Sequence, residues 1–120
     1  MEQQERLELV AGLVQELRRG TIVLSVLSRL RRPTYGYSLV QDLSQSGIPV
    51  EANTLYPLLR RLEKQDLVSS RWETDGPKPR KYYVVTEDGE AVYVQLREHW
   101  NRTVDSMAKL LEEKEDDPHE

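Results

Sequence analysis

The stretch from residue 53 to residue 67, NTLYPLLRRLEKQDL, constrains the fold of this chain more than any other. Its leucines at 55, 58, 59 and 62 recur every three or four residues, which predicts an amphipathic helix with one apolar stripe. The opposite face is polar and mostly cationic, and Glu63 is its one carboxylate. Because such a face suits a hydrogen-bonding polyanion, we expect this helix to enter the major groove of DNA. The predicted DNA contacts on it are Asn53, Thr54, Tyr56, Arg60, Arg61 and Lys64.

The first 19 residues predict a separate N-terminal helix that Gly20 ends. Its apolar stripe is narrow and consists of Val10, Leu13, Val14 and Leu17. Two interpretations stay open, because the stripe can pack on its own domain or on a second copy of the chain. The second interpretation places Val10, Leu13 and Leu17 at a dimer interface.

Residues 20–86 predict a compact domain that begins with two more helices. Residues 21–31 are apolar on nearly all sides, so this helix should lie in the centre of the domain, with Thr21 as its cap. The next helix opens at residues 35–38 (YGYS) and ends at Gly47. Of its two tyrosines we expect Tyr37 to pack in the core, since Tyr35 lies closer to the loop.

A β-hairpin is predicted after the amphipathic helix. Residues 67–73 and 80–86 have the composition of strands, and the glycine and two prolines between them mark a turn. Helix, turn, helix and two strands is the order of a winged helix-turn-helix, a mainly α (α+β) fold. Three cations near the tip of this wing are expected to reach a phosphate or the minor groove, although a solvated basic turn is the alternative: Lys78, Arg80 and Lys81.

Residues 87–113 predict a long C-terminal helix, with Thr86 as its expected cap. From Leu96 onward its apolar residues recur in alternating steps of four and three, which is typical of a coiled-coil seam. A small winged-helix core has no room for this seam, so we interpret the helix as a dimerisation element. The predicted interface residues on it are Trp100, Val104, Met107 and Leu111.

Residues 54–63, TLYPLLRRLE, resemble the signature of the PadR family of bacterial transcriptional regulators. Three other stretches resemble the family in order and spacing: RGT at 19–21, YGY at 35–37 and GPKPRKYY at 76–83 before Thr86 and Gly89. The resemblance runs from about residue 18 to the end of the chain. Asn53 and Asp66 depart from it, because the family usually has glycine at both positions. Asn and Asp tolerate capping or left-handed geometry, so the departure at Asn53 bears on operator preference rather than on the fold.

The resemblance implies a dimeric repressor that binds a pseudo-palindromic operator with one recognition helix in each half-site. It also implies that the start of the third helix lies against a DNA phosphate, with Tyr35, Tyr37 or Ser38 as the donor, and Tyr35 and Ser38 join the expected contacts. Control by a small aromatic ligand is a further implication. Trp100 is the candidate sensor, with Leu96 and Met107 beside it, because two aromatic rings at a two-fold axis suit a flat apolar ligand. The alternative is that Trp100 only anchors the dimer core.

The net charge of −4 does not oppose DNA binding, because the acidic residues gather at the ends of the chain. Residues 112–120 carry −5 and residues 1–17 carry −3, while residues 18–111 carry +4. Binding needs a locally basic surface rather than a basic chain. We interpret residues 114–120 as an acidic, disordered tail.

Several classes of function are disfavoured by what the chain lacks. There is no cysteine, and the two histidines, His99 and His119, have no partner at metal-ligand spacing. No catalytic motif is present, so we expect no enzyme activity, metal or cofactor. No apolar run is long enough to cross a membrane, and the N-terminus is too acidic for a signal peptide, so a cytoplasmic location is expected.

The leading hypothesis is therefore a homodimeric regulator of transcription that binds double-stranded DNA. The alternative is a winged-helix module that binds other proteins and no DNA. The acidic balance of the chain favours the alternative, and the basic face of the predicted recognition helix counts against it.

Overall fold

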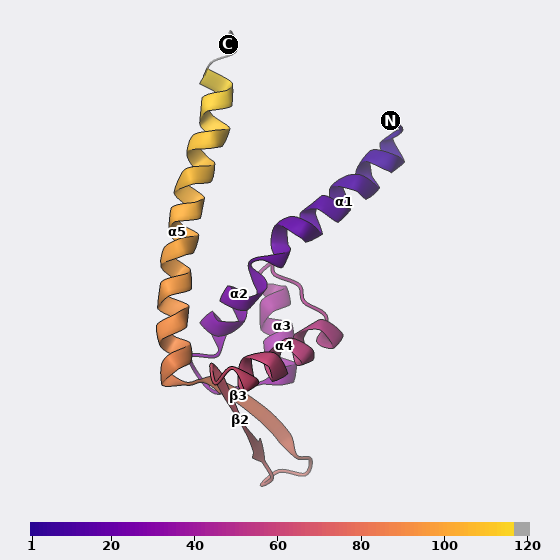
Figure 1. The fold of residues 1–120 in the computed structure, drawn as a ribbon. Helices are drawn as coiled ribbons and strands as arrows, with labels where there is room; N and C mark the ends of the chain where they lie inside the picture. The colour runs from indigo at the N-terminus through magenta and orange to yellow at the C-terminus, as the bar shows by residue number, and fades with distance from the viewer. Residues whose placement is uncertain (117–120) are drawn as a thin grey trace.

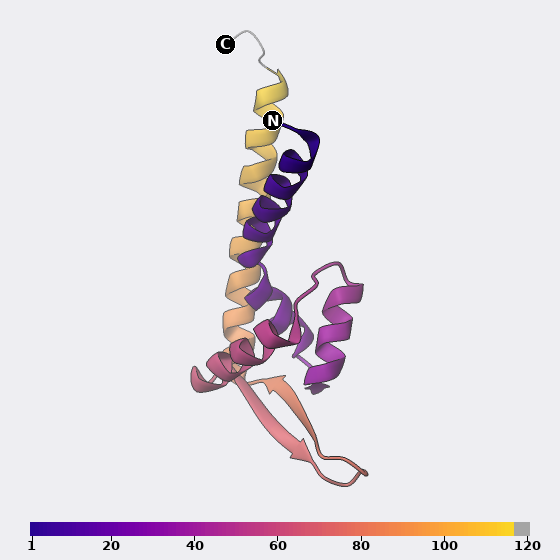
Figure 2. The same ribbon diagram turned by 90° about the vertical axis from the view of Figure 1, so that its right-hand side faces the viewer.

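Three short helices and a small sheet form the body of the protein, from which two longer helices extend (Figures 1 and 2). The computed structural model describes residues 1–116. This architecture confirms the predicted winged helix-turn-helix with an N-terminal helix and a long C-terminal helix. Its elements are, in order, α1 (Gln3–Arg19), α2 (Ile22–Arg29), β1 (Thr34–Tyr35), α3 (Gly36–Gln45), α4 (Ala52–Lys64), β2 (Val68–Glu73), β3 (Arg80–Val85) and α5 (Glu87–Asp116).

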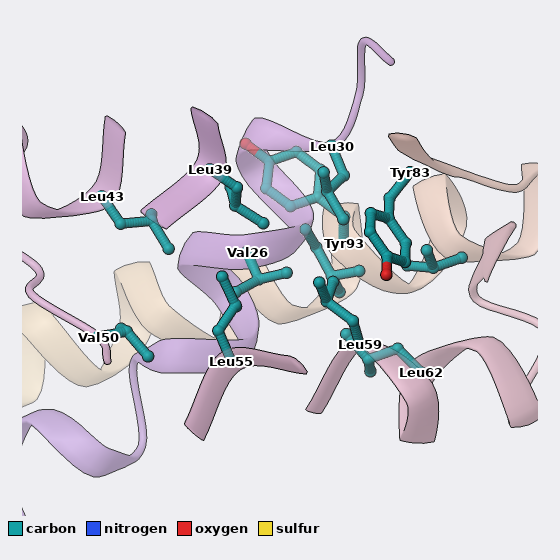
Figure 3. Close-up of a cluster of buried hydrophobic side chains, with 12 residues drawn as sticks. Val26, Leu30, Leu39, Leu43, Val50, Leu55, Leu59, Leu62, Tyr83 and Tyr93 are labelled. Atoms are coloured by element: carbon teal, nitrogen blue, oxygen red, sulfur yellow. The ribbon is translucent and has the colours of Figure 1, made fainter. Parts of the chain in front are cut away.

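One hydrophobic core holds the body together (Figure 3). The central helix α2 supplies Val26 and Leu27 to it, and Leu30 follows directly after the helix. The predicted stripe of α4 is buried as expected, since Leu55, Leu59 and Leu62 are almost inaccessible. The other buried members come from α3, the linker after it, the sheet and the first turns of α5: Leu39, Leu43, Val50, Val68, Tyr83 and Tyr93.

The sheet has three antiparallel strands in the order β1-β3-β2. The hairpin of β2 and β3 is the predicted wing. Strand β1 was not predicted, because its two residues, Thr34 and Tyr35, are too few for an alternating pattern. Its pairing with Tyr83 and Tyr82 of β3 joins the start of α3 to the wing.

The turn after α4 and the start of α5 form one tight joint. Asp66 has a φ of 61°, so the residue that replaces the family's glycine does take the left-handed conformation. Thr86 caps α5 as predicted, because its hydroxyl accepts a hydrogen bond of 3.0 Å from the backbone N–H of Gly89. The same hydroxyl donates to the carbonyl of Asp66 at 2.6 Å. A Cβ on Gly89 would lie 2.0 Å from the carbonyl oxygen of Leu67, so only glycine permits this approach.

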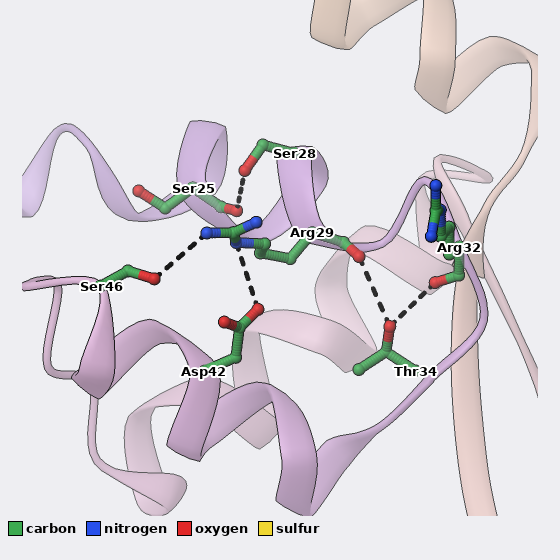
Figure 4. A network of polar contacts seen from close by, with 7 residues as sticks. All are labelled: Ser25, Ser28, Arg29, Arg32, Thr34, Asp42 and Ser46. Carbon is green, nitrogen blue, oxygen red and sulfur yellow. Dashed lines mark hydrogen bonds and ion pairs between the residues drawn. The ribbon is translucent and has the colours of Figure 1, made fainter.

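A polar network ties α2 to α3 (Figure 4). The guanidinium of Arg29 forms an ion pair of 3.1 Å with Asp42 and donates a hydrogen bond of 3.1 Å to Ser46. The hydroxyl of Thr34 donates to the carbonyl of Arg32 at 2.9 Å. These contacts help to hold α3 in its orientation beside α2.

The ends of α1 and α2 differ from the prediction in one detail. Thr21 does occupy the position before α2, but its side chain does not cap that helix. Its hydroxyl instead donates a hydrogen bond of 2.7 Å to the carbonyl of Arg18, at the end of α1. The same carbonyl also accepts a hydrogen bond of 2.9 Å from the backbone N–H of Thr21, so Thr21 closes the end of α1 with both its backbone and its side chain.

Helices α1 and α5 diverge from the body on the side opposite the wing (Figure 1). In this single chain α1 does not fold onto its own domain, and its apolar residues are exposed except Val14, which is partly buried. Helix α5 extends to Asp116, three residues beyond the predicted end at 113. Residues 117–120 of the predicted tail lie outside the described residues. None of the helices within residues 1–116 has both the length and the apolar character needed to span a bilayer.

Candidate nucleic-acid interface

The exposed side of α4 is a polar and cationic surface. Asn53, Arg60 and Lys64 are separated by seven and four residues, so they share one face of the helix, directly opposite the buried leucines. Thr54 and Arg61 lie along the edge of the same face and are also exposed. The structure therefore brings these five predicted contacts together on one surface.

The single carboxylate of this helix points away from that surface. Glu63 is partly buried and accepts a hydrogen bond from the hydroxyl of Ser70 on β2. The interaction holds Glu63 against the wing. The exposed face of α4 within residues 52–64 thus carries cations and amide or hydroxyl groups, which are the groups that contact phosphates and base edges.

Tyr56 has a structural role that its predicted function did not include. It is partly buried and lies against the first residue of α3, since a Cβ on Gly36 would meet its ring at 2.7 Å. Gly36 therefore lets the ring of Tyr56 fill the angle between α3 and α4. Tyr56 lies at the boundary between the exposed face of α4 and the wing.

The first turn of α3 reverses the predicted roles of its two tyrosines. Tyr37 is 69% exposed, so the expectation that it packs in the core is wrong. Tyr35 is partly buried, its hydroxyl donates a 2.8 Å hydrogen bond to Glu73, and its ring packs edge-on against Tyr82. The pairing of β1 with β3 causes the reversal, because it turns Tyr35 toward the sheet. Ser38 is exposed, as a phosphate contact requires.

The three predicted cations of the wing have different surroundings. Lys78 is exposed in the turn between the strands. The guanidinium of Arg80 lies 4.6 Å from the centre of the Tyr35 ring. The ammonium of Lys81 lies 5.7 Å from the Trp72 ring and 5.6 Å from the Tyr83 ring. Cation–π contacts of this length orient a side chain and leave its charge available to an anion.

The phenol of Tyr83 is neutral at physiological pH. Burial raises the pKa of its hydroxyl, and the nearby Tyr56 and Glu63 raise it further, while Arg60 lowers it. The pKa of Tyr35 is also raised, first because its hydroxyl donates a hydrogen bond to Glu73. Neither tyrosine therefore adds negative charge to this side of the molecule.

The residues predicted at the dimer interface are exposed apolar side chains. Val10, Leu13 and Leu17 form an open stripe on α1, to which the structure adds Leu7 and Leu9. On α5 the open stripe consists of Trp100, Val104, Met107, Leu110 and Leu111. Of the three residues predicted to bind an effector, Leu96 packs partly on the core of its own body, while Trp100 and Met107 lie further along the exposed part of the helix.

Two exposed residues of the wing were left out of the predicted site, Trp72 and Arg71. Pro57 of α4 is also exposed, and the helix continues through it. Trp72 pairs with Lys81 across the hairpin, and Arg71 is exposed on the neighbouring position. The two-residue alternation of β2 would have placed Trp72 and Arg71 on opposite faces, but only the register of the hairpin sets Trp72 against Lys81.

The comparison with known proteins agrees with this geometry. The model of the transcriptional regulator PadR-like family matches residues 23–95. A PadR family transcriptional regulator from Eggerthella lenta DSM 2243, whose crystal structure is known, is 51% identical, with a TM-score of 0.86 over 91% of this chain and 97% of the other. The transcriptional regulator Rv3488 of Mycobacterium tuberculosis is 30% identical over 97 residues, which are 80% of this chain and 87% of that protein.

A more distant structure shares the fold. It is the crystal structure of Bacillus subtilis PadR in complex with operator DNA, with 20% identity and a TM-score of 0.59 over 63% of this chain and 45% of the other. The family match spans α2 through the first turns of α5, which is the whole body described above. The chain therefore belongs to the PadR-like family of transcriptional regulators.

Proposed function

We propose that this PadR-family DNA-binding regulator is a homodimeric repressor that places one α4 helix in the major groove of each half of a pseudo-palindromic operator. The observation that carries the proposal is the exposed face of α4, where Asn53, Arg60 and Lys64 lie together without a carboxylate. Arginine reads guanine through two hydrogen bonds, and asparagine reads adenine in the same way. The Bacillus subtilis relative that shares this fold was crystallised with operator DNA, which supports the same partner for this chain.

The phosphate contacts are proposed to come from the wing and from the start of α3. Lys78, Arg80 and Lys81 supply positive charge on one side of α4. Ser38 lies in the first turn of α3, where no side chain caps the helix. Backbone N–H groups at such a helix end attract phosphate oxygens. Contacts of this kind set the position of the protein on the duplex and contribute no sequence preference of their own.

The dimer is proposed to form through the apolar stripes of α1 and α5. Both helices extend from the body on the side opposite the wing, so their pairing leaves the wing and α4 free. Burying these stripes removes a large apolar surface from water, which is the main source of stability in obligate homodimers. Repression follows if the occupied operator overlaps a promoter.

Control by a small aromatic ligand is proposed at Trp100. Its side chain is 43% exposed in the single chain, between Leu96, which packs on the body, and Met107 further out on α5. A flat ligand between two such helices would change the angle between the two bodies and so shift the dimer away from the form that binds DNA. The alternative remains that Trp100 only anchors the dimer.

Selection of binding sites from random duplexes, with the full-length protein, tests DNA binding and dimerisation together. The expected product is a sequence with two related half-sites about one helical turn apart. Arg60→Ala and Arg61→Ala should each weaken binding to it by about 1–3 kcal/mol if the residue reads a base. Lys109→Ala is the matched control, since Lys109 is exposed on the side of α5 opposite the apolar stripe. A protein with no salt-dependent affinity for any duplex would instead favour the alternative function, a protein-interaction module.

The role of Trp100 is tested by its fluorescence in a Trp72→Tyr background, which leaves one tryptophan in each chain. A flat aromatic compound that binds at the seam should quench it and change operator affinity by the same factor by which DNA changes ligand affinity. Compounds that alter neither signal would identify Trp100 as an anchor only.

A further inference from the structure

A cleft of about 400 Å³ lies between the start of α3, helix α4 and the wing. Its size falls within the roughly 300–1,000 Å³ that is usual for small-molecule sites. Five of its eight lining residues are aromatic, two are cations and none is acidic: Tyr35, Gly36, Tyr37, Tyr56, Trp72, Arg80, Lys81 and Tyr83. This composition differs from that of the groove beside α2 and α5, where Arg29 and Arg31 are already paired with Asp42 and Glu90.

Two of the aromatic side chains are unusually open. Outside α1 and α5, Tyr37 and Trp72 are the most exposed large apolar side chains between residues 20 and 86, with 69% and 59% of their surfaces accessible. Both line this one cleft, although they come from different elements. Exposed aromatic surface gathered at one concave place is typical of a binding site rather than of a solvated surface.

The two cations that line the cleft favour a ligand with a negative charge. Arg80 and Lys81 form no ion pair with an acidic side chain in the part of the chain that the structure describes. They also lie over the rings of Tyr35, Trp72 and Tyr83, at 4.6 to 5.7 Å from the ring centres. A cationic ligand would meet like charge at these rings, whereas an anion would find two cations and the uncapped first turn of α3. Lys81 is the more open of the two cations, because its cross-strand partner is Trp72, whereas Arg80 lies opposite Glu73.

We infer that this cleft binds a planar aromatic anion, with its ring against Trp72 and Tyr37 and its anionic group at Lys81 and Arg80. The shared chemistry includes aryl carboxylates and purine nucleotides. The site is separate from the one proposed at Trp100, which lies on α5 and belongs to the dimer seam. Four of the lining residues, Tyr35, Tyr56, Arg80 and Lys81, are also predicted DNA contacts. The ligand would therefore compete with DNA directly, and this consequence rests on the proposed function.

The indole N–H resonances of the two tryptophans test the site on the full-length protein. Trp72→Phe and Trp100→Phe assign the two signals, and naphthoate and adenosine monophosphate serve as the probes. We expect one of the two anions to shift the Trp72 signal and to leave the Trp100 signal in place. Naphthyl methanol, the neutral analogue of naphthoate, should bind roughly tenfold more weakly or worse, because it lacks the charge-assisted interaction. A shift of the Trp100 signal alone, or of neither signal, would contradict ligand binding at the cleft. Equal affinity for the neutral analogue would contradict the requirement for a negative charge on the ligand.

A pair of lysine variants distinguishes binding of the anion in the cleft from attraction of the anion by the overall positive charge of the wing. Lys81→Gln should weaken binding of the anion by roughly tenfold, as expected for one lost charge-assisted contact. Lys78→Gln removes the same charge from the wing turn, outside the cleft, and should leave the affinity for the anion unchanged. An equal loss in both variants would mean that the anion follows the field of the wing and not the cleft.

Competition is tested with the selected operator. The bound anion should raise the apparent Kd of the operator in proportion to its concentration, and Trp72→Ala should abolish this effect. If the anion occupied the cleft and left operator affinity unchanged, the proposed competition between the anion and DNA would be wrong. If the protein bound no duplex at all, the proposed function would fail while the indole measurement still decided the site.

Discussion

The body and the two long helices of this protein differ in how much of their apolar surface is buried. In the body, α2, α3, α4 and the sheet enclose one core, and Leu27, Leu39 and Leu59 are completely inaccessible. On α5 the large apolar side chains from Trp100 to Leu111 are at least 43% exposed. On α1 Leu17 is 74% exposed. The body therefore closes its core within one chain, while the helices leave theirs open.

This difference separates the side chains that stabilise the single folded chain from those that only a second chain could bury. A side chain that is buried by its own chain contributes to folding at any protein concentration. An apolar stripe that only a second chain can cover contributes by mass action, so its effect depends on concentration. Substitutions in the two regions should consequently differ in kind as well as in size.

The largest effect is expected when the chain ends after His99, which removes the exposed part of α5 and keeps Tyr93 and Leu96 on the core. The product should be a folded monomer, and its operator affinity should fall by about a hundred- to ten-thousand-fold, because the second half-site is no longer held close by the first. Sedimentation and operator titration measure the two changes. Removal of residues 114–120 only is the control and should leave the dimer intact. A shortened protein that still dimerises would move the interface to α1.

The next largest effect is expected in the free energy of unfolding of this shortened protein, when one of two leucines is replaced by alanine. Leu59→Ala should lower its free energy of unfolding by about 2–5 kcal/mol, since Leu59 is fully buried in the core. Leu13→Ala, on the open stripe of α1, should change it by less than about 0.5 kcal/mol, as is usual for a surface position. Urea unfolding at several protein concentrations measures both. In the full-length protein the Leu13 variant should instead weaken the dimer, and equal losses in the monomer would contradict the division into two regions.

The joint between the two regions should be sensitive to one methyl group. Gly89→Ala brings a Cβ to 2.0 Å from the carbonyl oxygen of Leu67, so α5 must shift relative to the body. We expect a loss of about 1–3 kcal/mol in the free energy of unfolding. Gly12→Ala in α1 is the matched control, because nothing lies within 4 Å of its added Cβ. In that helix alanine should stabilise by up to about 1 kcal/mol. Equal thermal midpoints for the two variants would refute the close approach at Gly89.

The smallest effect is expected at the ion pair that joins the same two regions. The guanidinium of Arg31 donates two hydrogen bonds of 2.8 and 2.9 Å to Glu90 at the start of α5, and Glu90 raises the pKa of Arg31. The two side chains are 48% and 38% exposed, so the coupling should be small and should fall as salt is added. A double-mutant cycle of Arg31→Gln and Glu90→Gln at two salt concentrations measures it. No coupling at low salt would mean that packing alone holds α5 in place.

The sequence predicted the elements that repeat over several turns or strands. The leucine stripe of α4, the central position of α2 and the seam of α5 all follow from helical periodicity, and the structure has them within a few residues of the predicted bounds. The capping of α5 by Thr86 and the left-handed geometry of Asp66 also agree with the prediction. These features depend on neighbours in the chain, so local chemistry is sufficient to identify them.

Features that depend on distant partners were missed or reversed. Strand β1 exists because β3, which is distant in the sequence, is available to pair with it: Thr34 lies opposite Tyr83, and Tyr35 lies opposite Tyr82. That pairing turns Tyr35 inward and leaves Tyr37 exposed, the opposite of what the position of the loop suggested. The cleft between α3, α4 and the wing has the same origin, because its lining residues come from three separate parts of the chain.

The amino-acid sequence by itself determined the fold class, the amphipathic helix α4 with its polar and cationic face, and the presence of an apolar stripe on α5 that one small domain does not cover. Periodicity and turn chemistry encode these properties locally, and four short motifs identified the family. Only the tertiary structure decided which side of α4 is free of carboxylates and which tyrosine is open. It also decided where Trp72, Lys81 and Tyr37 meet. The physical reason is that these outcomes depend on strand register and on the angle between helices, which contacts between distant residues set.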